Sequence, residues 1–285
     1  MIDVRNVLLG LVMLPFLAVP SYAEIIGFDS FANTAGGADY TIGAMAGQTA
    51  TVGTFGYTGG WSTGTASMQN VSGGLSHDLS PGVALDGQVI AFTSNGTASR
   101  RLVRPINYTP TDGTYYFSSL FQKTAVTTTR DMLTGLGPAE GATSSYGSSE
   151  ATYIGIYNGG FTFTPGGASF TELLTAAEVN VGETYFGLME IDFSTAGADA
   201  IEVSVFDGSS MLVANQTFTG LDLDGDISHF GLASWDFDDF VGVDELRFGT
   251  SLGDVMTPEP ASIAIWSLLG LSLAGFGYYR TRRKE

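Results

Sequence analysis

Alternating aspartates in the last third of the sequence are the residues best suited to bind a metal ion. They are Asp222, Asp224, Asp226, Asp236 and Asp238. Calcium takes several oxygen ligands from one or two loops, and this spacing can supply them. The segment is not an EF-hand, because the sixth and twelfth positions lack the required Gly and Glu. Calcium is therefore the one cofactor that the residues suggest, while a solvated acidic loop is the commoner outcome in so acidic a chain.

A second pair of carboxylates, Glu190 and Asp192, falls on one face of a predicted strand, because alternate residues of a strand point the same way. The pair resembles the start of the Glu-x-Asp-x-Glu strand of jelly-roll β-glucanases. Position 194 is Ser, however, so the strand carries no third carboxylate to act as the general acid. The sequence therefore predicts a solvated face at these residues and no enzyme activity.

Other kinds of chemistry are excluded by composition. The chain has no Cys, which removes thiolate metal sites and cysteine nucleophiles, and its two His are too few for an all-His metal site. Gly249 to Gly253 matches Gly-x-Ser-x-Gly, but both histidines precede it, so no catalytic triad in the required order can form. With 11 Lys and Arg against 29 Asp and Glu, the net charge of −18 would repel nucleic acid.

Three arginines are grouped at Arg100, Arg101 and Arg104. Arginine pairs well with carboxylates, and Asp and Glu are abundant in this chain. We expect ion pairs here, with an anionic polysaccharide site as the less favoured alternative. Trp61 and Trp235 are expected in core or edge packing and not in a sugar platform.

The N-terminus has the pattern of a signal peptide. Arg5 precedes an apolar run over residues 7–19, and a small-x-small site ends at Ala23. Pro15 and Pro20 would break a buried N-terminal helix, and 13 residues are too few to span a membrane. We expect signal peptidase to remove residues 1–23, so that the exported chain begins at Glu24.

The C-terminus carries an uncharged stretch over residues 261–279, followed by a basic tail over residues 280–285. Nineteen residues of helix are about 28 Å long, close to the thickness of the bilayer core. The cations are expected to hold the tail in the cytoplasm. The sequence therefore predicts one transmembrane helix, with the preceding domain outside the cytoplasmic membrane.

Pro258, Glu259 and Pro260 stand directly before this helix. This order of Pro-Glu-Pro, membrane-length helix and short basic tail resembles the PEP-CTERM sorting signal of Gram-negative and related bacteria. The resemblance implies that an exosortase, a membrane transpeptidase-like enzyme, recognises the three residues and processes the protein. An ordinary single-pass anchor is the alternative reading.

The segment between the two ends is rich in short β-branched and aromatic runs separated by Gly, Asn, Asp and Ser. Several runs alternate with period two, and Asn158-Gly159 and Asp207-Gly208 have the composition of hairpin turns. Such a pattern is typical of an all-β antiparallel jelly-roll sandwich. Predicted strands cover residues 24–31, 88–93, 113–121, 151–157, 160–163, 184–193, 200–206, 211–219, 229–235 and 242–249. One short helix is predicted near 169–178 from a capping box.

The opening Gly27 to Phe31 and the closing Val243 to Ser251 resemble the first and last strands of laminin-G-like, concanavalin-type jelly rolls. The resemblance implies a sandwich over residues 24–251, with a linker over 252–260. Together these features predict an exported, exosortase-processed surface or extracellular-matrix protein that is associated with exopolysaccharide and is not an enzyme. The alternatives are a glycan-active enzyme on the same scaffold and a purely structural adhesive protein.

Overall fold

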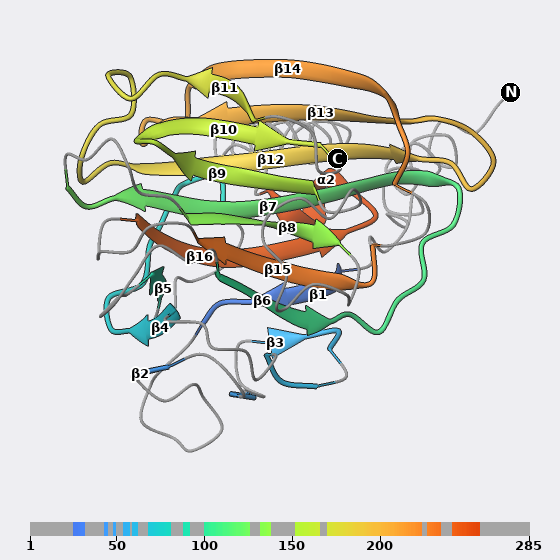
Figure 1. Cartoon of the computed structure of the whole chain (residues 1–285), viewed down its shortest axis with the longest axis horizontal. Coiled ribbons are helices and arrows are strands. Elements are labelled where there is room, and N and C mark those ends of the chain that lie inside the picture. Colours follow the sequence, from blue (N-terminus) through green and yellow to red (C-terminus); the bar gives the residue numbers. More distant parts are fainter. Residues whose placement is uncertain are drawn as a thin grey trace, which may run out of the picture.

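The fold is a sandwich of two antiparallel β-sheets (Figure 1). The computed structural model describes residues 25–31, 43–44, 48–49, 54–57, 59–61, 68–80, 88–91, 100–125, 132–137, 152–165, 170–223, 227–234 and 241–256. Within these residues, the strands of both sheets run in roughly the same direction across the molecule. The prediction of an all-β sandwich is confirmed.

Among the described residues, the large sheet has ten strands and the small sheet has six. In order across the large sheet lie β14 (Leu212–Leu221), β13 (Asp199–Phe206), β12 (Thr184–Phe193), β7 (Gly113–Lys123), β16 (Val241–Gly249), β5 (Gln88–Ala91), β4 (Met68–Val71) and β2 (Gly43–Ala44). Beside β16 also lies β1 (Ile25–Asp29), which pairs in turn with β3 (Thr54–Phe55). The small sheet is formed by β11 (Thr171–Leu174), β10 (Gly160–Thr164), β9 (Thr152–Tyr157), β8 (Met132–Gly137), β15 (His229–Ser234) and β6 (Arg100–Pro105).

Local sequence explains the hairpin between β9 and β10. Asn158 and Gly159 have φ angles of 50° and 80°, which a two-residue primed turn requires and which Asn and Gly adopt most readily. The predicted turn at Asp207-Gly208 also lies where expected, between β13 and β14, and the Asp207 carboxylate accepts hydrogen bonds from the backbone of Ser209 and Met211.

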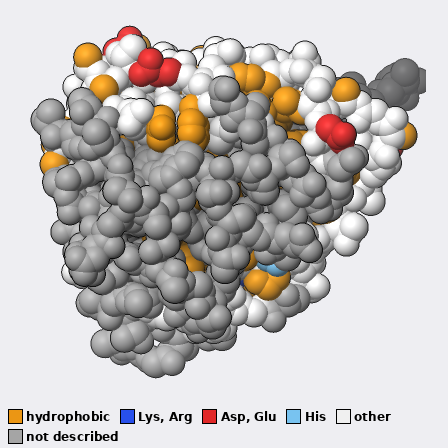
Figure 2. All heavy atoms as spheres, in the orientation of Figure 1, with side chains coloured by type: hydrophobic (Ala, Val, Ile, Leu, Met, Phe, Trp, Pro, Cys, Tyr) orange, Lys and Arg blue, Asp and Glu red, His pale blue; other side chains and the backbone are white. Residues whose placement is uncertain are grey.

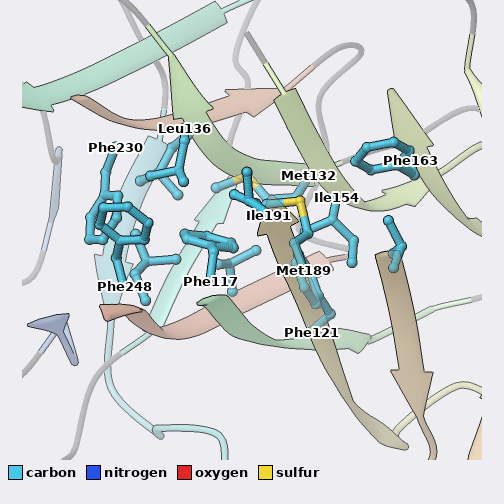
Figure 3. Packing of buried hydrophobic residues seen from close by; sticks show 14 of the residues in the cluster. Phe117, Phe121, Met132, Leu136, Ile154, Phe163, Met189, Ile191, Phe230 and Phe248 are labelled. Atoms are coloured by element: carbon cyan, nitrogen blue, oxygen red, sulfur yellow. The ribbon is translucent and has the colours of Figure 1, made fainter. Parts of the chain in front are cut away.

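The core lies between the sheets, and strands such as β12 and β13 contribute alternate residues to it (Figure 3). On β12, Met189 and Ile191 point inward, while Glu190 between them is partly exposed. Aromatic rings fill much of the space: Phe117 meets Phe230 edge to face, with ring centroids 5.6 Å apart. Trp61 is buried against Phe31, as predicted, whereas Trp235 lies outside the described residues.

One predicted element is wrong. Residues 171–174 form the strand β11 instead of the helix predicted near 169–178, because Leu174 and Thr171 pair with Phe161 and Phe163 of β10. The hydrogen bonds from Thr175 to the Glu178 carboxylate, which resemble a helix cap, hold a turn after the strand. Pairing with β10 outweighs the local helical signal here. The sequence analysis also did not predict the strands β2, β3, β4, β6 and β8.

The folded unit continues beyond the last strand into the short helix α2 (Leu252–Val255), where the sequence placed a linker. Val255 is fully buried, and its carbonyl accepts a hydrogen bond from Ser118 Oγ of β7. No helix among the described residues is long and apolar enough to cross a membrane. The predicted signal peptide, the cleavage site at Ala23 and Glu24, the Pro258–Pro260 motif, the span 261–279 and the basic tail all lie outside those residues.

Charged side chains are buried where β16 bends. Glu245 has a φ of 54° at a bulge in β16, and its carboxylate is paired with Arg247. The neighbouring Asp244 is fully buried and accepts hydrogen bonds from the backbone N–H groups of Leu75 and Glu245. Burial raises the pKa of Asp244 well above its ordinary range, and the nearby Glu245 charge adds to this. Burial also raises the pKa of Glu245, although the Arg247 charge opposes the change.

These two carboxyls predict that the protein is more stable at pH 5 than at pH 8. A carboxyl whose pKa is raised in the folded state binds its proton more tightly there than in the unfolded chain. Its contribution to stability is complete below about pH 4 and is lost as the pH rises through the raised value. Because 1 kcal/mol shifts the melting temperature of a domain of this size by about 2–4 °C, we expect a difference of a few degrees, measured by calorimetry.

The variant Asp244→Asn tests the cause. It removes the ionisation at nearly constant shape, so its melting temperature should depend less on pH than that of the wild type. Asp222→Asn is the matched control, because Asp222 is exposed. Since Asp222 is also a predicted calcium ligand, a chelator is added to all samples, and the melting temperature of this variant should then depend on pH as strongly as that of the wild type. A wild-type melting temperature that rises from pH 5 to pH 8 would contradict the prediction.

Candidate functional site

The outer face of the large sheet is divided into a covered half and an open half. The covered half carries Leu120, Phe186 and Leu188, which are packed beneath Leu75, Leu79 and Val255. His77 stacks on Phe186, and its Nε2 lies 2.6 Å from the carbonyl oxygen of Asp207. This half is therefore a second, smaller core and not a binding surface.

The open half carries polar side chains from four adjacent strands, which we call the acidic face. Its residues are Thr114, Tyr116, Glu190, Asp192, Glu202, Asn215 and Thr217. Glu190 lies directly opposite Tyr116 of β7 and directly opposite Glu202 of β13, so the three form one row across the sheet. Directly opposed residues of antiparallel strands have Cβ atoms about 4.5–5.5 Å apart, which places the two glutamates in one small area.

Most carboxylates of the acidic face have a hydrogen-bond donor. Asn215 Nδ2 donates to Glu202 Oε1 at 2.7 Å and to Ser204 Oγ at 2.9 Å, and Thr114 Oγ1 donates to Asp192 Oδ1 at 2.7 Å. Glu190 accepts no hydrogen bond from the part of the chain that is described. The carboxylate at the centre of the row is thus available to a ligand.

Electrostatics distinguish Glu190 from its neighbours. Partial burial raises the pKa of Glu190, and the charges of Glu202 and Asp192 raise it further. Burial and the charges of Glu190 and Asp192 likewise raise the pKa of Tyr116, so its hydroxyl keeps its proton at neutral pH. The row therefore offers a neutral phenol as donor and two carboxylates as acceptors.

The structure supplies a partner that the sequence analysis missed. Glu190 and Asp192 lie on one face, as predicted, but the second glutamate of the row is on the neighbouring strand β13. The alternation of Ile201, Val203 and Val205 already indicated that Glu202 points outward. Only the register of the β12–β13 hairpin places it opposite Glu190.

The predicted calcium site lies mostly outside the described residues. Asp222 is exposed at the end of β14, whereas Asp224, Asp226, Asp236 and Asp238 belong to segments that are not described. Among the residues that are described, no group of three or more His, Asp or Glu side chains could hold a metal ion.

The Lys and Arg side chains that the structure describes are buried. Arg104 forms an ion pair with Asp29 at 2.6 Å, which agrees with the predicted pairing; the side chains of Arg100 and Arg101 are not described. Lys123 Nζ donates to three backbone carbonyls, and burial lowers its pKa. The described Lys and Arg side chains are those of Arg104, Lys123 and Arg247. None of these residues is more than 6% exposed. On the face that Figure 2 shows, the described residues accordingly include Asp and Glu but no Lys or Arg.

No protein-family model matches this chain, and no curated protein matches it. Among solved structures, the chain is similar to an endo-β-1,4-glucuronan lyase from the fungus Trichoderma reesei, with 13% identity, a TM-score of 0.42, and coverage of 66% of this chain and 90% of the lyase. A PL-14 alginate lyase from Aplysia kurodai is 9% identical, with a TM-score of 0.43 and coverage of 80% and 100%. Lectin II from Ulex europaeus is 11% identical, with a TM-score of 0.40 and coverage of 64% and 97%.

Proposed function

We propose that this protein is an exported surface or matrix protein that binds a neutral, hydroxyl-rich polysaccharide on the acidic face without cleaving it. The observation that carries the proposal is the row of Tyr116, Glu190 and Glu202. At its centre, the Glu190 carboxylate accepts no hydrogen bond from the described residues. Export rests on the N-terminal signal pattern, and release from the membrane rests on the Pro-Glu-Pro motif and an exosortase partner.

The chemistry of the row matches a sugar chain. Sugar hydroxyls donate hydrogen bonds to carboxylates, and hydrogen bonds to a charged acceptor are stronger than neutral ones. The ring of Tyr116 packs in part against the covered half. The part that stays exposed lies beside the polar hydroxyl and suits the apolar face of a sugar ring. Glu202 and Asp192 are held in place by Asn215 and Thr114, so the acceptors are ordered before the ligand arrives.

Charge selects the class of polysaccharide. The acidic face carries Glu190, Asp192 and Glu202, whereas the described Lys and Arg side chains are buried, so an acidic polysaccharide would be repelled. A neutral chain pays no such penalty. We therefore expect neutral glucans or galactans to bind in preference to alginate or glucuronan.

A glycan array probed with the protein tests this function, and variants of the row test the site. Glu190→Gln and Glu202→Gln should each weaken binding roughly tenfold, because a hydrogen bond to a charged group contributes about 1.5–3 kcal/mol and one to the neutral Gln amide about 0.5–1.5 kcal/mol. Tyr116→Ala should weaken binding by a comparable factor, whereas Tyr116→Phe should keep the stacking surface and bind more tightly than Tyr116→Ala.

Glu172→Gln is the matched control, because Glu172 is exposed on β11 of the other sheet and the change in charge is the same. It should bind like the wild type. Equal affinities for Glu172→Gln, Glu190→Gln and Glu202→Gln would remove the acidic face as the binding site, even if the protein still binds a glycan.

The second candidate function is glycoside hydrolysis, and the Glu190–Glu202 pair is the observation that favours it. Retaining glycosidases place two carboxyl groups about 5–5.5 Å apart, and one of them needs a raised pKa, which Glu190 has. Measuring new reducing ends in the same incubations separates the two functions. Binding without product release supports the first, and product release that Glu190→Gln abolishes supports the second.

A further inference from the structure

The last described part of the chain, α2, packs on the outer face of the large sheet. Val255 is fully buried in the cluster that contains Leu120 and Leu188, and its carbonyl accepts a hydrogen bond from Ser118 Oγ at 2.9 Å. Met256 is partly buried against the same cluster. The chain therefore leaves the sandwich from this face and not from the end of a strand.

The point of exit lies near the middle of the face and close to the acidic face. Ser118 is the sixth of the eleven residues of β7, and β7 is fourth in the order of eight described strands from β14 to β2 (Figure 1). Tyr116 precedes Ser118 by two residues, so both point to this face, about 7 Å apart. The row of Tyr116, Glu190 and Glu202 thus begins about 7 Å from the residue that holds α2.

The connection from α2 to the predicted membrane helix is short. Five Cα steps lead from Met256 to Ala261, the first residue of the apolar stretch over residues 261–279, and they reach at most about 18 Å. The headgroup layer on one side of a bilayer takes up about 5–7 Å of this length. In a chain anchored by that helix, the exit point would lie within about 13 Å of the headgroups, about the width of one α-helix with its side chains.

We propose that the bilayer covers the acidic face while the C-terminal helix anchors the chain, and that the face becomes accessible once the chain is released. This inference rests on the proposed function, which supplies both the anchor and the ligand. Tilting the sandwich does not uncover the face, because the exit point is near its middle and lifting β14 would press β4 and β2 against the headgroups. The released protein would bind its polysaccharide, whereas the anchored precursor would not.

Labelling of a single cysteine tests the cover without any glycan, because the native chain has no Cys. The full chain with Asp192→Cys, an exposed position on the acidic face, is produced in a Gram-negative host that exports it and leaves the C-terminal helix in place. Spheroplasts are then treated with a maleimide that carries a long polyethylene glycol chain. A Gly/Ser linker of about 20 residues inserted after Met256 adds about 25 Å on average and should speed labelling roughly tenfold or more.

Two controls isolate the distance between the sheet and the membrane. The same linker appended after Glu285 leaves the connection to the membrane unchanged, so Asp192→Cys should be labelled as slowly as without a linker. Glu172→Cys, exposed on β11 of the other sheet, loses the same charge and should be labelled equally fast with the short and the long connection. Equal labelling of Asp192→Cys with both connections, or recovery of the full chain outside the membrane fraction, would overturn the proposal.

Glycan binding by spheroplasts that carry the chain without added Cys separates this inference from the proposed function. A fluorescent neutral glucan should bind roughly tenfold more tightly to the chain with the long connection than to the native chain. Slow labelling of the native-length chain, with no glucan or galactan bound by either chain, would support the cover and remove the proposed function. Equal labelling together with equal glucan binding would keep the proposed function and remove the cover.

Discussion

Replacing Arg104 with Met is expected to lower the free energy of unfolding by about 3–5 kcal/mol, because it leaves the Asp29 carboxylate buried without a counter-charge. Both side chains are almost fully buried, and the pair joins β1 of the large sheet to β6 of the small sheet. Arg104 also donates from Nε to the carbonyl of Gly59 and lies 4.0 Å over the Tyr57 ring. Urea denaturation followed by tryptophan fluorescence measures the loss.

A double variant separates the lost pair from the stranded charge. Asp29→Leu/Arg104→Met removes both charges, and an apolar replacement of a buried ion pair is often tolerated, so it should be more stable than Arg104→Met alone. The exposed Glu172→Gln should change stability little. If Arg104→Met unfolds at the wild-type urea concentration, the buried pair does not hold the sheets together.

In the native host, the mature protein is expected to begin at Glu24 and to end near Pro258, without the helix and the basic tail. This expectation follows from the proposed function, in which a signal peptide exports the chain and the C-terminal cations stay inside, so that residues 258–260 would meet an exosortase at the outer surface. Glu259→Ala should convert nearly all of the protein to a membrane-retained form, because the helix still spans but the recognised carboxylate is gone. Intact-mass spectrometry of membrane and medium fractions measures both forms.

Ser262→Ala is the control for this prediction, because it changes the segment just past the motif and keeps Pro-Glu-Pro intact. It should be processed like the wild type. Mass spectra in which most wild-type protein still carries Glu285 would reduce the C-terminal segment to a plain anchor.

Several features of this protein follow from the sequence alone because they depend on local pattern. Alternation of apolar residues predicted β12 over residues 184–193, as observed, and showed that Glu190 and Asp192 share a face. The Asn158-Gly159 turn was equally readable, since few other residue pairs adopt its positive φ angles. The predictions of a signal peptide at one end and a membrane-spanning helix at the other use only the composition and length of each segment, so they too come from the sequence alone.

The tertiary structure decided which of these local elements became neighbours. Residues 171–174 carried a helical signal, yet they form β11 because β10 offers a partner. Arg104 and Asp29 are 75 residues apart and meet only because their strands face each other across the core. Glu202 joins Glu190 through the register of the β12–β13 hairpin. Period and turn chemistry act over a few residues, whereas strand order and burial depend on packing between distant segments, which a local pattern does not contain.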